Sequence, residues 1–229
     1  NESGMDIVYI SASGSIHGTG QSLFRYQISD VNSPWTDKVD RVGIYWGAPS
    51  DQPTCGYDPI NKLFLKTTGV NSKPLYFWDL RPERTTNKDQ AVVVEGSISN
   101  LVQWLNNFTT TTGKSIRHCA LDFDPNRKNF LLWCGSTQVW RIIPPNPLST
   151  SGWSAEMEPV ISSDQNPPLN VGVGILGKWD YIPGFDVFIG LENETNGSVW
   201  VYKPLGWVAP DSSGGGGGPI NQLPSVSVT

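Results

Sequence analysis

Short β-prone apolar runs alternate with turn residues along most of the chain. In residues 177–202, the run 187–189 follows a turn at Pro183 and Gly184, and a second run at 199–202 follows a polar loop. Two such runs bounded by turn residues predict a β-hairpin. The same order of runs recurs upstream, in whole or in part, in residues 7–28, 57–80 and 123–143.

The recurring hairpins have a regular spacing. An aromatic residue of the first run stands at Tyr9, Phe64, Phe130 and Phe188, and one of the second run at Phe24, Tyr76, Trp140 and Trp200. Subtraction of successive numbers gives 55, 66 and 58 residues for the first series and 52, 64 and 60 for the second. A period slightly above about fifty residues, with about four strands in each unit, is typical of β-propeller blades. We therefore expect an all-β fold, as a propeller of about four blades or part of a larger one; the alternative is a β-sandwich, whose hairpins also look alike.

Composition supports the all-β reading and excludes two kinds of partner. The 229 residues include 24 Gly, 18 Pro and ten Trp, which is typical of many turns between aromatic-rich strands. The net charge is −5 and the 16 basic residues form no run, so we expect no nucleic-acid binding. No apolar stretch approaches the roughly eighteen residues that a membrane span needs, so we expect none.

The three cysteines predict one disulfide. If the hairpin in residues 123–143 turns between Asn126 and Arg127, the numbers of opposed residues sum to 253, which places Cys119 opposite Cys134. Directly opposed side chains in an antiparallel pair lie close enough for a sulfur bridge. The alternative is a pair of buried free thiols in an intracellular protein. Cys55 has no evident partner, and a disulfide favours an extracellular or cell-surface location.

Three segments share a more specific pattern. Residues 23–38 (LFRYQISDVNSPWTDK) contain a Tyr-centred strand, a polar turn and a Trp; residues 139–157 repeat the order and residues 199–207 shorten it. This pattern resembles divergent kelch-like or galactose-oxidase-like β-propellers, although the paired glycines of kelch repeats are missing. The resemblance implies a propeller fold in a secreted modular protein. Kelch-like oxidases bind copper through His and Tyr ligands, but no residue here matches that pattern, and we expect no cofactor.

The remaining segments complete the expected organisation. Residues 91–95 predict an inner strand, and residues 158–176 the next inner strands. Residues 98–108 have apolar positions at helical spacing and predict a short amphipathic helix or an inserted loop. Propeller blades are expected to occupy residues 1–207, followed by a Pro/Gly/Ser-rich flexible linker at 208–224 and the start of an immunoglobulin-like module at 225–229.

The strand count predicts an incomplete ring. The chain supplies three nearly whole blades and one hairpin near residues 7–28, with strands at 7–12 and 23–28. A propeller closes only when every blade covers its neighbour. We therefore expect an upstream segment, a protein partner or a second copy to complete it; alternatively, the first hairpin is a cap or four blades close on themselves.

Few residues indicate chemistry. Only His17 and His118 are present, which is too few for an ordinary zinc or copper site. Asp58 and Asp124 each precede Pro at equivalent positions, which indicates turn formation rather than catalysis. Asp122, two residues before Asp124, makes a carboxylate pair for glycoside hydrolysis the weaker interpretation.

Exposed aromatic residues are the candidates for ligand binding. Trp46, Trp104 and Trp179 are candidate residues for stacking on sugar rings, the alternative being packing between blades. Taken together, these features predict a non-catalytic extracellular module for binding or structural assembly, with a protein partner or second copy and a polysaccharide as its expected partners. The alternatives are a carbohydrate-active enzyme or kelch-type oxidase completed by residues outside this chain, and an intracellular kelch adaptor.

Overall fold

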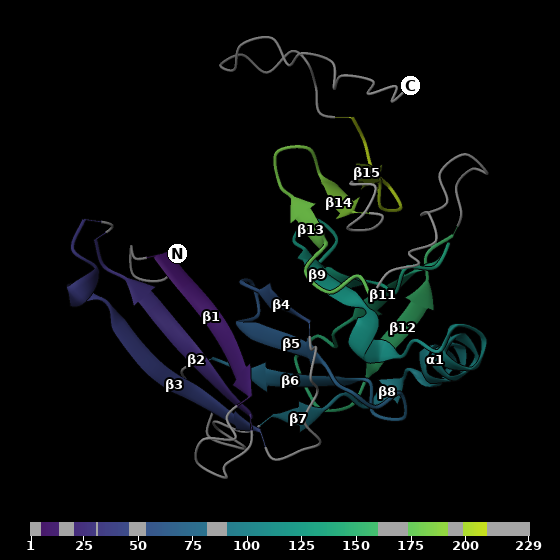
Figure 1. Ribbon diagram of the computed structural model, residues 1–229, viewed down its shortest axis with the longest axis horizontal. Coiled ribbons are helices and arrows are strands. Elements are labelled where there is room, and N and C mark those ends of the chain that lie inside the picture. Colours follow the sequence, from purple (N-terminus) through teal and green to yellow (C-terminus); the bar gives the residue numbers. More distant parts are fainter. Residues whose placement is uncertain are drawn as a thin grey trace.

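The protein folds into four small β-sheets and one α-helix within the part of the chain that the structure describes. This part of the computed structural model comprises residues 6–13, 21–30, 32–45, 54–81, 91–159, 174–191 and 199–209 (Figure 1). None of the four sheets closes on itself. The all-β expectation is confirmed, while the expected linker from residue 210 onward and the module at 225–229 lie outside the described residues. No helix among the described residues is long and apolar enough to cross a membrane.

The first sheet is an antiparallel meander in the order β1-β2-β3. Its strands are β1 (Asp6–Ser13), β2 (Gln21–Ile28) and β3 (Lys38–Tyr45), with the short helix η1 (Pro34–Thr36) before β3. The predicted hairpin at 7–28 is therefore confirmed. A third strand joins it, because β3 pairs with β2 over almost its whole length.

The second sheet has the order β4-β5-β6-β7. Its strands are β4 (Cys55–Asp58), β5 (Leu63–Thr67), β6 (Leu75–Asp79) and β7 (Val92–Val93). The strand predicted at 91–95 is found as the two residues of β7, but it lies at an edge of its sheet and is not an inner strand. The two residues of β7 pair with Tyr76 and Phe77 of β6 and end this sheet at the edge opposite β4.

The third and fourth sheets continue the pattern. The third has the order β8-β12-β11-β10-β9 and consists of β8 (Gly96–Ser97), β9 (Ala120–Asp124), β10 (Asn129–Trp133), β11 (Val139–Ile143) and β12 (Trp153–Met157). The fourth has the order β13-β14-β15 and consists of β13 (Trp179–Ile182), β14 (Val187–Leu191) and β15 (Val199–Tyr202). All pairings in both sheets are antiparallel except that of β8 with β12. Most of the strands expected within 158–176 fall outside the described residues, and no strand is assigned to 158–159 or 174–176.

The predicted register of the β9–β10 hairpin is confirmed. Phe123 lies opposite Phe130 and Leu121 opposite Leu132, so opposed numbers sum to 253 as expected. Cys119 and Cys134 form the predicted disulfide, just beyond the paired ends of the two strands. Both cysteines are buried.

The first turn of the second, third and fourth sheets has the same backbone form. Lys62, Lys128 and Asp186 occupy equivalent positions, and their φ angles are 53°, 54° and 54°. The left-handed conformation is uncommon for residues other than glycine. Its recurrence at one place in three turns is structural support for the repeat that the sequence predicts.

Carboxylates stabilise two of these turns, as the Asp-Pro pattern predicts. Asp58 Oδ1 accepts hydrogen bonds from the amides of Ile60 and Asn61, at 2.8 and 3.1 Å. Asp124 Oδ1 accepts from the amides of Asn126 and Arg127, both at 3.0 Å. Each aspartate thus satisfies backbone donors of the turn that follows it.

The fourth sheet has Ile182 at the position of these aspartates, and the turn that follows is bonded to the third sheet through Asp186. Arg127 Nη1 lies 2.8 Å from both Asp124 Oδ2 and Asp186 Oδ1, so it links the turn of the third sheet to that of the fourth. Asn126 adds a 2.9 Å hydrogen bond to Asp186. The hydrogen bond from Arg127, as the main cause, lowers the pKa of Asp186 to about 2.

The sheets pack in series, with a separate apolar core between each pair. Phe64 and Trp78 of the second sheet pack with Leu23 of the first. The largest core lies between the second and third sheets and includes α1, and another lies between the third and fourth. Successive side chains of a strand point to opposite faces, so Phe130 and Leu132 of β10 face the second sheet, whereas Leu131 and Trp133 face the fourth. Four layers in series differ from the two layers of the β-sandwich alternative.

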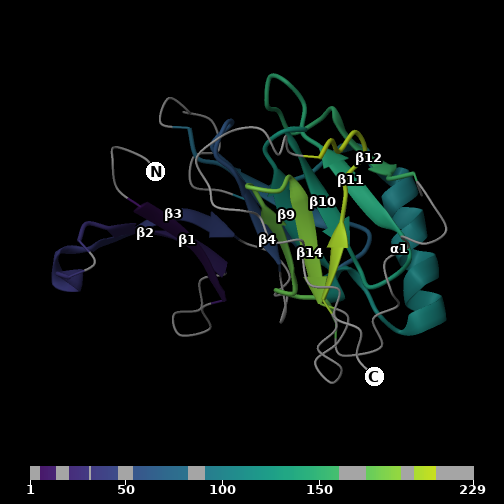
Figure 2. The same cartoon turned by 90° about the horizontal axis from the view of Figure 1, so that it is seen from above.

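The first strands of the second, third and fourth sheets lie side by side, and the first sheet reaches this row through the ring of Tyr9. The rings of Tyr9 on β1 and Tyr57 on β4 are 4.6 Å apart. A Cβ atom on Gly56 of β4 would lie 3.2 Å from the Cα atom of Asp122 on β9, and Tyr181 of β13 donates its amide to Asp122. Figure 2 shows the first sheet on one side of this arrangement and α1 on the other.

Candidate functional site

Helix α1 (Ser99–Thr112) forms one wall of a surface groove. Its predicted apolar stripe turns inward, where Leu101 and Leu105 are fully buried, so the helical alternative for 98–108 is confirmed. The helix ends at Gly113, whose φ of 72° lets its amide bond the carbonyl of Thr109 at 2.8 Å. Asn71, from the turn between β5 and β6, hydrogen-bonds the carbonyl of Leu105 and holds the helix against the second sheet.

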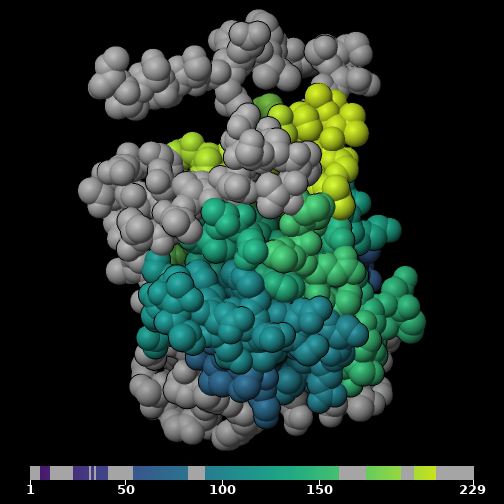
Figure 3. Space-filling view, turned by 90° about the vertical axis from the view of Figure 1, so that its right-hand side faces the viewer, coloured from purple at the N-terminus to yellow at the C-terminus, as the bar shows by residue number. Residues whose placement is uncertain are grey.

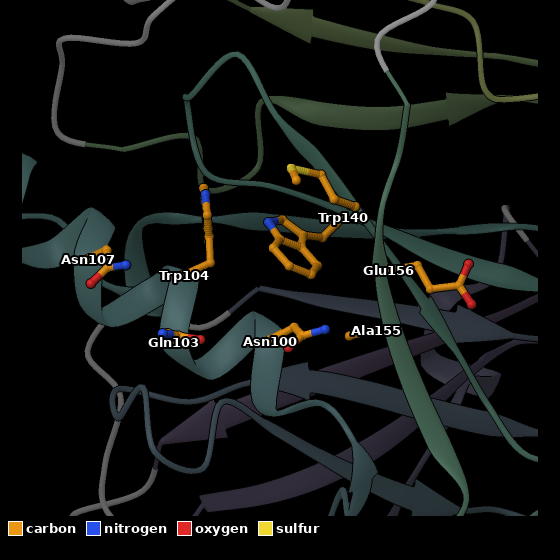
Figure 4. A pocket seen from close by; sticks show the side chains of 8 residues that line it. Asn100, Gln103, Trp104, Asn107, Trp140, Ala155 and Glu156 are labelled. Atoms are coloured by element: carbon orange, nitrogen blue, oxygen red, sulfur yellow. The ribbon is translucent and has the colours of Figure 1, made fainter.

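The groove lies between α1 and strands β11 and β12 and has a volume of about 400 Å³. Figure 3 views the side of the molecule on which α1 lies, and Figure 4 shows the groove from close by. Its lining residues come from α1 and from two strands: Asn100, Gln103, Trp104, Asn107, Trp140, Ala155, Glu156 and Met157. This volume falls in the range of small-molecule sites, about 300–1,000 Å³.

Two indoles supply the aromatic surface of the groove. The ring centroids of Trp104 and Trp140 are 5.6 Å apart, and the rings are inclined by 54°. Phe108 stacks on Trp104 at 5.0 Å, with the two planes only 9° from parallel. The Nε1–H of Trp104 donates to Oε1 of Gln138, so this ring is held both by stacking and by a hydrogen bond.

The polar side of the groove carries amides and no unpaired charge among its described lining residues. Asn100, Gln103 and Asn107 are exposed and project from one side of α1. The only ionisable lining residue, Glu156, is paired with Arg141 at 2.5 Å. Figure 4 shows the Glu156 carboxylate directed away from Trp140. The groove therefore offers neutral donors and acceptors beside aromatic rings.

A second polar cluster lies along the adjoining first strands of the second, third and fourth sheets. Asp122 accepts the amides of Phe123 and Tyr181, both at 2.8 Å, and its carboxyl group also hydrogen-bonds Asp180 of β13. Burial, together with the hydrogen bond to Asp180, raises the pKa of Asp122 to about 7. Asp122 therefore retains its proton up to about pH 7, and its hydrogen bonds to Asp180 and to the amide of Tyr181 join β9 to β13.

Cys55 and Lys66 stand opposite each other on β4 and β5, beside this pair. Lys66 is buried, and its burial lowers its pKa to about 8. Although Cys55 is exposed as a residue, desolvation by surrounding protein raises the pKa of its thiol to about 11. A thiol that stays protonated at neutral pH is a poor nucleophile.

The arrangement of this cluster differs from that of a glycoside hydrolase. Such enzymes separate their two carboxyl groups by about 5 Å or more, to leave room for the sugar and water. Asp122 and Asp180 are instead directly hydrogen-bonded to each other. Among the described residues, no three His, Cys, Asp or Glu side chains are grouped so that they could hold a metal ion.

The three tryptophans predicted to stack on a ligand differ in where the structure places them. Trp104 is half-buried and lines the groove. The expectation for Trp179 is not met, because its ring is only 4% exposed, stacks on Phe188 and donates to the carbonyl of Leu131. Trp46 lies outside the described residues, as does His17. Sequence reasoning missed Trp140 as part of this groove, since its strand position indicated only a core residue.

The two terminal sheets each leave one apolar face uncovered by the described residues. On the first sheet, the register places Val8, Tyr26 and Val39 on the face opposite the core; Val8 is 46% and Val39 59% exposed. On the fourth sheet, Val199 and Val201 are 60% and 41% exposed on the face opposite Trp200.

Comparison with known protein families, with curated proteins and with solved structures finds no match to this chain.

Proposed function

We propose that this chain is a non-catalytic extracellular module of binding or structural assembly, built as an arc of a β-propeller that a second copy of the chain completes. The observation that carries the proposal is the pair of apolar faces on the first and fourth sheets that no described residue covers. Monomeric proteins rarely leave such faces open to water.

The order of the strands supports the propeller arc. In a propeller, the first strand of every blade lines the axis and later strands lie progressively outward. The adjacency of β4, β9 and β13, together with the contact between Tyr9 on β1 and Tyr57 on β4, is what such an arc requires. The recurrent left-handed residue after the first strand supports equivalent units.

The number of sheets favours a second copy as the missing part. The chain supplies four sheets, and two copies would supply eight, the upper end of the usual range of about four to eight blades. The face of the first sheet on one copy would then cover the face of the fourth sheet on the other. Both faces are chiefly aliphatic, so their contact would bury apolar surface on each side.

Two further features support the extracellular and non-catalytic parts of the proposal. Disulfides such as Cys119–Cys134 persist mainly in oxidising compartments. The carboxyl pair of Asp122 and Asp180 is closed on itself and accepts two backbone amides, which suits a structural link between sheets.

Native mass determination of the intact chain tests the second copy. We expect a species of twice 25.1 kDa, and we expect Val39→Lys or Val201→Lys to convert it to the monomer, because a charge would be buried in either interface. Val70→Lys is the matched control, since Val70 is 42% exposed in the turn between β5 and β6.

Two other outcomes have defined meanings. A monomer that binds an apolar fluorescent dye, and loses this binding in both lysine variants, would replace the second copy with another protein as the missing part. A monomer that binds no dye and is unaffected by the lysines would overturn the arc altogether.

A further inference from the structure

We infer that the groove beside α1 binds a neutral saccharide, which packs on the accessible part of the Trp104 indole, reaches the edge of Trp140 and bonds its hydroxyl groups to Asn100, Gln103 and Asn107. The inference depends only on the third sheet and its helix. It therefore does not require the ring of sheets to be completed.

The aromatic part of the groove suits the apolar face of a sugar ring. The rings of Trp104 and Trp140 are inclined by 54°, and because Trp140 is only 4% exposed, Trp104 supplies most of the aromatic surface that a ligand can reach. The stacking of Phe108 and the hydrogen bond to Gln138 hold Trp104 in one orientation before any ligand arrives. A prearranged ring loses little conformational freedom on binding, which favours affinity.

The amides suit the edge of the same ligand. Positions 100, 103 and 107 are three and four residues apart, so their side chains follow one another along one face of α1. Each amide has both a donor and an acceptor, as a hydroxyl group does. None of the three side chains has a hydrogen bond to another described residue, so their groups remain available to a ligand.

Trp140 adds an independent observation. The residue is only 4% exposed, and its Nε1–H has no acceptor among the described residues. A buried donor without an acceptor is unfavourable, and such cases are rare in native proteins. Figure 4 shows this nitrogen on the side of the indole that faces Trp104. A hydroxyl oxygen that entered between the two indoles would satisfy it, after a small movement of flexible lining side chains such as Met157.

The charge of the groove selects a neutral ligand. The described lining contains no Lys, Arg or His, and the Glu156 carboxylate is already paired with Arg141. Phosphorylated or strongly acidic ligands would therefore have no cation to compensate their charge here. A peptide would also need pairing for its backbone amides, whereas hydroxyl groups and apolar ring faces match what the groove offers.

Titration with neutral oligosaccharides tests the inference. We would add the hexamers of β-1,4-glucose, α-1,4-glucose and N-acetylglucosamine to the intact chain and follow tryptophan fluorescence and calorimetric heat. Binding of at least one of them is expected, with affinity at least tenfold lower for Trp104→Ala and partly retained for Trp104→Phe.

Two further variants separate binding from folding. Asn107→Ala should lower affinity about three- to tenfold without unfolding the helix, because Ala favours helix and Asn107 is exposed. Trp35→Ala is the matched control, since Trp35 is 79% exposed in η1, and the affinity of this variant should equal that of the wild type. The inference would be overturned if none of the hexamers bound at millimolar concentration, if Trp104→Ala and Trp35→Ala bound equally well, or if an uncharged peptide bound in their place. The native mass has no bearing on any of these outcomes.

Discussion

The third and first sheets differ in how many of their faces are covered. The third lies between two other sheets, and its strand β10 is buried at every position from Asn129 to Trp133. Within the described part of the chain, the first has a neighbour on one face only, and from Asp6 to Ile10 its strand β1 alternates between exposed and partly buried residues. An uninterrupted apolar strand therefore marks a sheet inside the series, whereas an alternating strand marks its end.

Removal of the aromatic ring of Phe130 from the third sheet should show this difference most strongly. Phe130→Ala should lower the free energy of unfolding by about 3–5 kcal/mol, because the fully buried ring leaves a cavity between the second and third sheets. Val39→Ala in the first sheet should cost less than about 1 kcal/mol in the monomeric chain, since Val39 is largely exposed. Urea unfolding measures both values. Similar losses for the two variants would mean that both sheets are covered alike.

Removal of the disulfide should have the next largest effect. The bridge closes a loop of 15 residues in the third sheet, so Cys119→Ala combined with Cys134→Ala should cost about 2–4 kcal/mol. Cys55→Ala is the control, because Cys55 is a free thiol at an exposed position, and it should cost less than about 1 kcal/mol. If reducing agent left the unfolding midpoint of the wild-type protein unchanged, the bridge would not contribute to stability.

The smallest of these effects is a pH dependence at the contact between the third and fourth sheets. The folded protein retains the proton of Asp122 up to about pH 7, whereas the ordinary carboxyl pKa is 3.8. The folded state therefore binds more protons between these values, and its stability falls as pH rises from about 4 to about 7. We expect wild-type protein to lose about 1–3 kcal/mol over this interval relative to Asp122→Asn.

The comparison of wild type with this variant isolates one group. His118, whose pKa burial lowers, is present in both proteins, so its contribution cancels in the comparison. Asp186 contributes stability that is present above pH 3.8 and lost as pH falls through about 2, outside the interval. Parallel stability curves between pH 4 and 7 would show that Asp122 does not hold its proton in the folded state.

Features confined to one hairpin could be predicted from the sequence. The β9–β10 register and the disulfide followed from the position of a single turn, because antiparallel pairing is symmetric about it. The carboxylate turn at Asp58 followed from local bonding preferences in the same way. The helix was open to two interpretations, since its apolar spacing did not show which elements would cover it.

Contacts between sheets could not be predicted in this way. Nothing near Asp122 in sequence indicates Asp180, because the two meet only when β9 and β13 lie side by side. Burial of Trp179 depends likewise on the aromatic residues of two sheets, and Trp140 on a helix packed beside its strand. The sequence did not predict that β7 belongs to the second sheet, because a run of valines does not show which strand it pairs with.

The ion pairs of Arg127 have a mechanical consequence. Arg127 bonds Asp124 beside it and Asp186 of the next sheet, whereas its counterpart in the second sheet, Asn61, bonds Asp58 of its own turn. For the third and fourth sheets to slide along each other, a charged group would have to leave a largely enclosed partner. Arg127 thus fixes the position of the third sheet relative to the fourth. The position of the second sheet relative to the third depends instead on the shapes of the packed side chains.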